Sequence, residues 1–354
     1  MFPYLLMIGL PATLAIATVR RAGFLLLAVA ILYWLMVGFR YHVGMDWNNY
    51  LSIYLGSTTR SFTDLLFSTE PAYQLLMWSA ANLGGGLILI NAVSALVFCW
   101  GFFAVAKRCR EPFLAIVIAT PLLVIAFAMS GVRQAMAMGI IYYLYATWEN
   151  RGAIGRMMLV VVASVFHFSA IFVLIFVALS SKASQLTRIA AAIASGLLLL
   201  LFLYLAPEAT EGYHQRYVAG PRTLEAPGAL AQVGVLAVAA LVYFTIRKIW
   251  IEVNGRNPLY ESLAVAALIA VPATYYSSVG AYRFALYLWP MAMYIFSGLP
   301  ALTASVQLRA LYRVIVVTAS VVLLVGWLSL SNSGSAWLPY KNWLLQEEGA
   351  RLRR

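Results

Sequence analysis

Long apolar segments constrain this chain more than any other feature, because each is about long enough to cross a bilayer as a helix. Of the 354 residues, 63% are hydrophobic and only 10% are charged, so the chain cannot build a water-facing surface around a core. The sequence therefore predicts an all-α polytopic membrane protein with about ten or eleven transmembrane or re-entrant helices. The predicted segments are 2–19, 23–39, 87–106, 112–130, 133–149, 157–180, 188–206, 229–247, 259–276, 280–300 and 311–330.

The whole chain, residues 1–354, is expected to form a single integral membrane domain. Two polar stretches interrupt the apolar segments, a long loop at 40–86 and a second at 207–228. Arg20 and Arg21 follow the first apolar segment, and basic residues beside a span favour the cytoplasmic side. The 40–86 loop is therefore predicted to lie outside.

Parts of this external loop have the pattern of short amphipathic helices that lie along a membrane surface, namely 46–54, 61–67 and 71–82. Further along the chain, Lys and Arg no longer fall on the sides that full crossings would require. One segment within 133–180 is therefore predicted to be re-entrant or broken. Broken helices inside a membrane usually line a cavity.

The net charge of +12 comes mainly from short loops between apolar segments. Membrane topology and anionic lipid headgroups explain such charges, so no nucleic-acid partner is expected. The C-terminal Arg351-Leu-Arg-Arg354 is interpreted as a contact to anionic lipids. The three histidines and two cysteines show no metal-ligand spacing, and the sequence predicts neither a metal nor another cofactor.

Asp46 is the leading candidate for chemistry, within the polar, aromatic stretch from Arg40 to Tyr50. A carboxylate beside a bilayer is costly unless it is hydrated, paired or used. Asp64, the only other aspartate, is interpreted as a solvated loop charge. The stretch therefore predicts a hydrated site at the membrane surface.

Arg133 and Gln134 stand in an otherwise apolar stretch and are followed by small residues that allow close approach. An arginine at a helix end can reach the interface, but a buried guanidinium also suits a phosphate or pyrophosphate. His167 lies about ten residues, some 15 Å, into its segment. It can be a structural hydrogen-bonding group between helices or a polar ligand in a cavity.

Tyr282 and Arg283 form a third polar group, in a long run where Arg283 is the only charge. Tyrosines beside an arginine can contact sugars, although an arginine in a turn or an aromatic belt at the headgroups gives the same pattern. Glu70 precedes Pro71, where an acidic residue either complements the dipole of the following helix or takes part in catalysis.

The order of several short motifs along the chain resembles that of the EpsG family of Wzy-like polysaccharide polymerases. The motifs are Arg40 with Gly44-Met-Asp46 and Tyr50, Glu70-Pro71, Gly131-Val-Arg-Gln134 with Ala137, Phe166-His-Phe-Ser-Ala170, Arg283 and Pro339-Tyr-Lys341. The resemblance implies a membrane glycosyltransferase of the GT-C type that uses a polyprenyl-linked sugar donor. It also implies a multi-pass protein of the bacterial cytoplasmic membrane, with a flippase and a chain-length regulator as pathway partners.

On this interpretation the protein polymerises polyprenyl-pyrophosphate-linked oligosaccharide repeats, with Asp46, Arg133 and His167 as the catalytic residues. The substrate-binding residues are expected to be Arg40, Tyr50, Glu70, Gln134, Tyr282 and Arg283. Arginines would hold the pyrophosphate, while Asp46 would orient or deprotonate the acceptor. The open alternatives are a flippase for the same lipid-linked glycan and a related ligase or single-sugar transferase.

Overall fold

The computed structural model describes residues 1–18, 23–57, 63–64, 70–179, 186, 193 and 228–346. The described part is helical, and its only extended pairing is an isolated bridge between Arg40 and Asn342. The helices, with π- and 3-10 segments marked η, are α1 (Phe2–Ile16), α2 (Gly23–Gly38), α3 (Trp47–Ser57), α5 (Pro71–Asn82), α6 (Gly86–Arg108), α7 (Pro112–Ala119), η1 (Thr120–Ala128), α8 (Val132–Ala146), η2 (Trp148–Asn150), α9 (Ala153–Ser164), η3 (Phe168–Val173), α10 (Leu174–Leu179), α13 (Ala229–Thr245), α14 (Arg247–Asn254), α15 (Pro258–Tyr276), α16 (Ser278–Ala285), η5 (Leu286–Leu288), α17 (Trp289–Gly298), η6 (Leu299–Leu302), α18 (Val306–Leu330), η7 (Gly334–Ala336) and η8 (Trp343–Leu345).

Several of these helices are long and apolar enough to cross a membrane, which confirms the predicted all-α polytopic membrane fold. They are Gly86–Arg108, Pro258–Tyr276, Ser278–Leu302 and Val306–Leu330. Helices α13 and α14 would together form a fifth span but meet at 84°, so the segment predicted at 229–247 is bent at its end. The other apolar helices of the described part are shorter: Phe2–Ile16, Gly23–Gly38, Pro112–Ala128, Ala153–Ser164 and Phe168–Leu179. The segment predicted at 188–206 and the polar loop at 207–228 lie almost entirely outside the described residues, as does the basic C-terminal tail.

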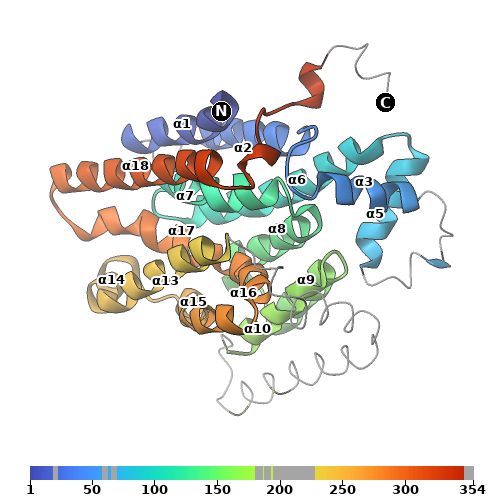
Figure 1. Cartoon of the computed structure of the whole chain (residues 1–354). Coiled ribbons are helices and arrows are strands. Elements are labelled where there is room, and N and C mark those ends of the chain that lie inside the picture. The colour runs from blue at the N-terminus through green and yellow to red at the C-terminus, as the bar shows by residue number, and fades with distance from the viewer. Residues whose placement is uncertain are drawn as a thin grey trace.

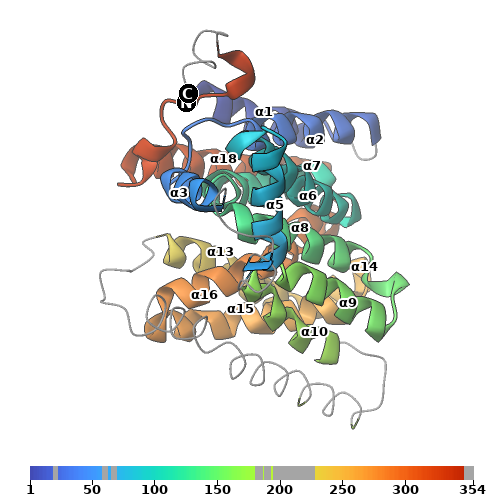
Figure 2. The ribbon, with the colours of Figure 1, turned by 90° about the vertical axis from the view of Figure 1, so that its right-hand side faces the viewer.

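The bundle has three tiers, with α6, α7 and α8 between α1, α2 and α18 on one side and α13, α15 and α10 on the other (Figures 1 and 2). Two glycines bring α6 and α8 together. A Cβ on Gly101 would lie 1.8 Å from the carbonyl oxygen of Gly139, and a Cβ on Gly139 would lie 2.2 Å from that of Val97. Gly139, one of the small residues after Arg133, therefore serves helix packing, as such residues often do in membranes.

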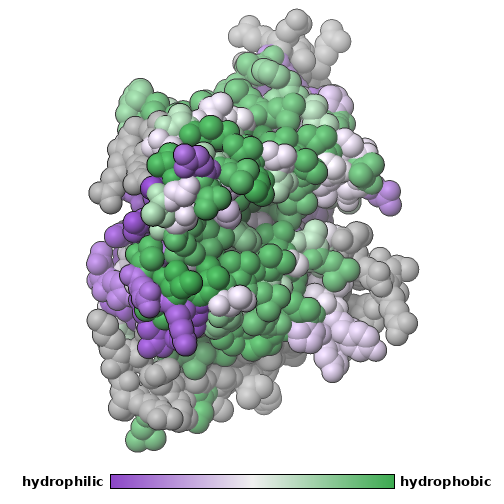
Figure 3. Space-filling view, turned by 90° about the vertical axis from the view of Figure 1, so that its left-hand side faces the viewer, coloured by the Kyte–Doolittle hydropathy of each residue, from purple (hydrophilic) through white to green (hydrophobic). Residues whose placement is uncertain are grey.

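Helices α3 and α5 lie at one end of the bundle and α14 lies at the other (Figure 1). Helix α5 has the bounds predicted for the third surface helix, and α3 overlaps the first. Of the second, 61–67, the structure describes only Thr63 and Asp64. The face in Figure 3 is mainly hydrophobic, with hydrophilic residues gathered along one edge, as expected for a surface that meets lipid.

The helix break predicted within 133–180 lies at Val165–His167, between α9 and η3. The Val165 carbonyl accepts a hydrogen bond of 3.1 Å from the Ala72 N–H at the start of α5. His167 then has an extended backbone and begins η3. The break thus turns a histidine of an apolar segment toward the start of α5.

Candidate active site

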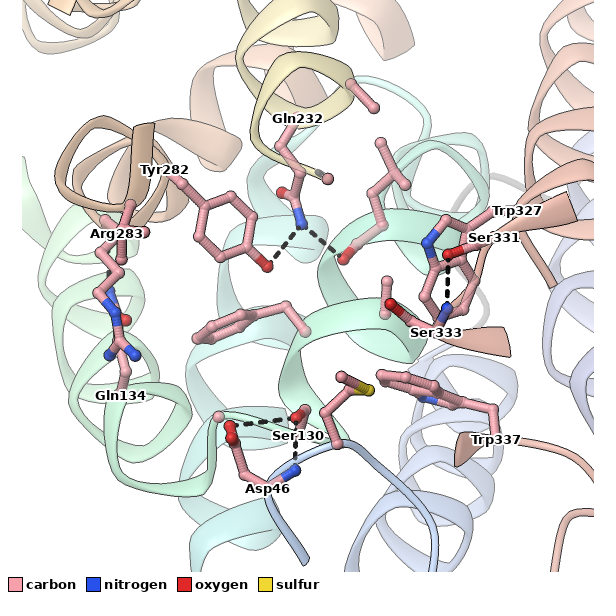
Figure 4. A pocket seen from close by; sticks show the side chains of 18 of the residues that line it. Asp46, Ser130, Gln134, Gln232, Tyr282, Arg283, Trp327, Ser331, Ser333 and Trp337 are labelled. Carbon is pink, nitrogen blue, oxygen red and sulfur yellow. Dashed lines mark hydrogen bonds between the residues drawn. The ribbon is translucent and has the colours of Figure 1, made fainter. Parts of the chain in front are cut away.

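A cavity of about 680 Å³ lies among the loop before α3, the start of α8, the start of α13, α16 and the end of α18 (Figure 4). This volume is typical of small-molecule sites. Most of the predicted site residues line the cavity: Asp46, Tyr50, Arg133, Gln134, His167, Tyr282 and Arg283. Arg40 and Glu70 do not line it.

Asp46 is held against Ser130, which follows the π-helix η1. The Ser130 hydroxyl donates to Oδ2 of Asp46 at 3.2 Å, and the Asp46 N–H donates to the same hydroxyl oxygen at 3.3 Å. Gly44 makes this approach possible, because its φ is +103° and a Cβ there would lie 2.3 Å from the Met129 carbonyl oxygen. The Gly-Met-Asp motif therefore has a steric purpose: it seats the carboxylate at the cavity wall.

Glu70 joins two of the predicted catalytic residues. Its Oε1 lies 2.5 Å from Nδ1 of His167, and its Oε2 accepts a hydrogen bond from Nη1 of Arg133 in an ion pair. The Glu70 side chain does not cap α5. Its position therefore favours a role in the site over the helix-dipole interpretation.

The Glu70 carboxylate is buried, and burial alone would raise its pKa. His167 and Arg133 outweigh that effect and lower the pKa of Glu70 to about 2. The group is therefore an anion at neutral pH. It fixes the Arg133 guanidinium, which lies 5.8 Å from the ring centre of Tyr50 and 5.9 Å from that of Tyr73.

Some polar atoms of this group have no hydrogen-bond partner within the part of the chain that the structure describes. They are Nε of Arg133, Nε2 of His167 and Oε1 of Gln134. All three residues line the cavity, and both His167 and Gln134 are more than nine-tenths buried. Buried polar groups are rarely left unpaired, so these residues of the cavity wall keep hydrogen-bonding capacity that the described part of the protein does not satisfy.

Arg283 lies in the last turn of α16, on the side of the cavity opposite Trp327 and Trp337 (Figure 4). Gln134 fixes that helix, because its Nε2 donates to the Arg283 carbonyl oxygen at 2.7 Å. Arg40 lies elsewhere: it is only 2% exposed and donates to the Val37 carbonyl and to Asn91. Its burial lowers the pKa of Arg40 to about 10.

Sequence reasoning missed several lining residues, among them Ser130, Gln232, Trp327 and Trp337. The π-helix η1 explains the positions of Gln232 and Trp337, because carbonyl oxygens of this helix accept hydrogen bonds from both side chains. Gln232 donates to the Leu122 carbonyl at 3.0 Å, and the Trp337 indole donates to that of Ile125 at 2.8 Å. A lone glutamine in the apolar segment 229–247 was the available signal.

The model of one protein family, the EpsG family, matches residues 23–342 of the chain. The match extends from the start of α2 to the turn before η8 and so includes every described element of the cavity. No curated protein and no solved structure matches the chain. Among the described residues, no three His, Cys, Asp or Glu side chains are grouped so that they could hold a metal ion.

Proposed function

The chain belongs to the EpsG family of Wzy-like polysaccharide polymerases, and from that premise we propose that it joins polyprenyl-pyrophosphate-linked oligosaccharide repeats into exopolysaccharide, capsule or O-antigen. The family indicates an exopolysaccharide polymerase-like function, and the apolar helices indicate a multi-pass membrane protein. The proposal adds the lipid-linked substrate, a GT-C-type transfer and the outer face of the bacterial cytoplasmic membrane. Anionic lipids, a flippase and a chain-length regulator are the proposed partners.

One observation carries the proposal: a single cavity is lined by two guanidinium groups, a carboxylate and a buried histidine from widely separated segments. These are Arg133, Arg283, Asp46 and His167. Transfer from a pyrophosphate needs positive charge at the leaving group and a group that orients or deprotonates the acceptor. The cavity holds both kinds of group.

In the proposed reaction, an acceptor hydroxyl oxygen attacks the anomeric carbon of the donor sugar. The bond from that carbon to the pyrophosphate oxygen breaks, and its electron pair leaves with the polyprenyl pyrophosphate. Arg133 and Arg283 stabilise the charge on this leaving group, so the step needs no metal ion. The acceptor proton passes to Asp46, while Glu70 keeps Arg133 and His167 in position.

The test is to incubate purified protein with its polyprenyl-pyrophosphate-linked repeat and to resolve the products by size. We expect a ladder of multiples of the repeat, and we expect Asp46→Asn to lose it. Asp64→Asn is the matched control, because Asp64 is the only other aspartate and does not line the cavity. Arg133→Lys should also fail, since an ammonium group cannot form the bidentate contacts of a guanidinium.

The proposal is wrong if Asp46→Asn and Arg133→Ala, both present at normal levels, make polymer of full length. A native protein that leaves the mass of the substrate unchanged, beside an active control, would favour the flippase alternative. Movement of the same lipid-linked glycan across sealed vesicles would then be the next measurement. A product with only one added unit would favour the ligase or single-sugar transferase.

A further inference from the structure

One wall of the cavity carries no charge. It is formed by the end of α18 and the turn after it, where Trp327, Ser331, Asn332, Ser333 and Trp337 line the cavity. The sequence from 327 to 337, Trp-Leu-Ser-Leu-Ser-Asn-Ser-Gly-Ser-Ala-Trp, contains no ionisable side chain. In Figure 4 this wall faces the side of Arg283 and Gln134, and Asp46 and Ser130 lie between the two.

The turn that follows α18 is tightly fixed. Gly334 N–H donates to the Ser331 carbonyl at 2.9 Å, and a Cβ on Gly334 would lie 2.3 Å from the carbonyl oxygen of Leu328. The Ala336 carbonyl accepts a hydrogen bond of 2.9 Å from Gly44 N–H, in the loop that carries Asp46. The uncharged wall and the carboxylate are thus held in one backbone framework.

The two tryptophans of the wall have different roles. Trp337 is only 2% exposed. Its indole N–H donates a hydrogen bond to the Ile125 carbonyl, and its own carbonyl accepts one of 2.7 Å from the Tyr4 hydroxyl. Trp327 is only partly buried and packs edge to face against Trp337, with ring centres 4.8 Å apart. Trp337 is therefore the support, and Trp327 is the ring that a bound molecule can contact.

We propose that this wall binds the sugar ring attached to the pyrophosphate of the donor, with Trp327 beneath the ring and Ser331, Asn332 and Ser333 at its hydroxyls. The inference rests on the proposed function and deepens it. With the pyrophosphate on the arginine side and the ring on the tryptophan side, the bond that breaks lies beside Asp46. The orientation of the donor follows from the charge difference between the two walls.

The chemistry of the wall suits a neutral sugar better than the other parts of the substrate. A sugar ring has an apolar C–H face that packs on an aromatic ring, and hydroxyls at its edge that need donors and acceptors. Serine hydroxyls and an asparagine amide supply both. A second phosphate would need cations, and a polyprenyl tail would leave these polar groups without partners.

The experiment measures the binding of two separate probes to purified protein: polyprenyl pyrophosphate without sugar, and the soluble oligosaccharide released by mild acid from the lipid-linked repeat of the producing strain. Trp327→Ala should weaken oligosaccharide binding by about tenfold and leave polyprenyl pyrophosphate binding unchanged. Trp327→Phe, which keeps an aromatic face, should recover most of the affinity. Trp100→Ala is the matched control, because Trp100 is 49% exposed on α6 and does not line the cavity.

The inference is overturned if Trp327→Ala binds the oligosaccharide as the native protein does. It is also overturned if both probes weaken together in Trp327→Ala and Trp327→Phe, since that would mean a structural role. The proposed function can fail separately: a native protein that makes no ladder but binds the oligosaccharide through Trp327 would have a glycan site without polymerase activity. If the native protein makes the ladder and Trp327→Ala keeps full affinity for the oligosaccharide, the proposed function stands and the proposed sugar-binding role of this wall is wrong.

Discussion

Two buried glutamates, Glu70 and Glu111, stand at the same local position and have different surroundings. Each precedes a proline that begins a helix, α5 or α7, and neither side chain caps its helix. Each carboxylate pairs instead with an arginine far along the chain, Glu70 with Arg133 and Glu111 with Arg313. A Glu-Pro sequence therefore predicts a helix start but not what its carboxylate does.

The Glu111 pair is closed. Arg313 donates from Nε at 2.8 Å and from Nη2 at 2.6 Å, one to each carboxylate oxygen, and its side chain is 6% exposed. It lies about 21 Å along α18 from Trp327, away from the cavity. Such a bidentate pair locks α18 to the start of α7, and nothing in its geometry leaves room for a ligand.

The Glu70 pair is open. Only one oxygen of Glu70 meets Arg133, the other meets His167, and the Arg133 side chain remains 25% exposed at the cavity. The same two residue types thus form a clamp at one site and hold an accessible cation at the other. The difference lies in which groups the tertiary structure brings to each carboxylate.

The largest expected effect is on the rate of polymer formation, which should fall when Arg133 is removed but not when Arg313 is removed. Arg133→Ala should lower the rate of polymer formation by about 100- to 1,000-fold, because it removes charge stabilisation at the leaving group. Arg313→Ala should leave the rate per folded molecule within about twofold of native, since Arg313 does not line the cavity. Both rates are measured from the product ladder after correction for folded protein. Equal loss in the two variants would contradict the distinction.

The stability effect should run the other way. Arg313→Ala leaves Glu111 buried without its partner and should cost about 3–5 kcal/mol of unfolding free energy. Thermal unfolding of the purified protein in detergent measures this as a fall in the midpoint. The double variant Glu111→Leu with Arg313→Met should recover most of the loss, because an apolar pair needs no charge compensation. A double variant as unstable as the single one would show that the pair is not the cause.

Glu70→Gln tests whether the charge of Glu70, unlike that of Glu111, contributes to the reaction. The amide keeps the size of the carboxylate but loses the charge that holds Arg133 and His167, and misplaced groups can cost up to about 100-fold in rate. Glu111→Gln is the matched control and should affect unfolding more than rate. If Glu70→Gln changes stability alone, Glu70 has no positioning role in the reaction.

Much of the cavity could be predicted from the sequence because polar residues are rare in this chain and therefore conspicuous. Arg133, His167 and Arg283 each interrupt an apolar context, Asp46 lies in a polar loop after an apolar segment, and the structure brings all of them to one cavity. Intramembrane polar groups are costly, so they tend to gather where hydration or a ligand compensates them. The helix over Pro71–Asn82 was equally clear, since Pro71 marks its start.

The rest depended on tertiary structure. Ser130 and Trp327 are ordinary residues for a membrane helix or its aromatic border, so nothing local marks them as cavity residues. Arg40, predicted for the pyrophosphate, belongs to the same motif as Asp46 but points to Asn91 and Val37. Helix lengths were also misjudged: the apolar run predicted at 157–180 continues through the break at His167, whereas the span predicted at 311–330 begins earlier, at Val306.

The smallest expected effect concerns pH. Because the pKa of Glu70 is lowered to about 2 from the ordinary 4.5, the folded state binds fewer protons than the unfolded state only in the acid range. The stabilisation by the Glu70 charge is therefore fully present above about pH 4.5 and is lost as the pH falls toward 2. The difference in unfolding midpoint between native protein and Glu70→Gln should stay constant from about pH 8 to 5 and shrink only below about 4.5. Asp64→Asn serves as the control in the same series. A difference that already changes near pH 6 would assign the titration to His167 and would mean that the Glu70 charge is not what holds the open pair together.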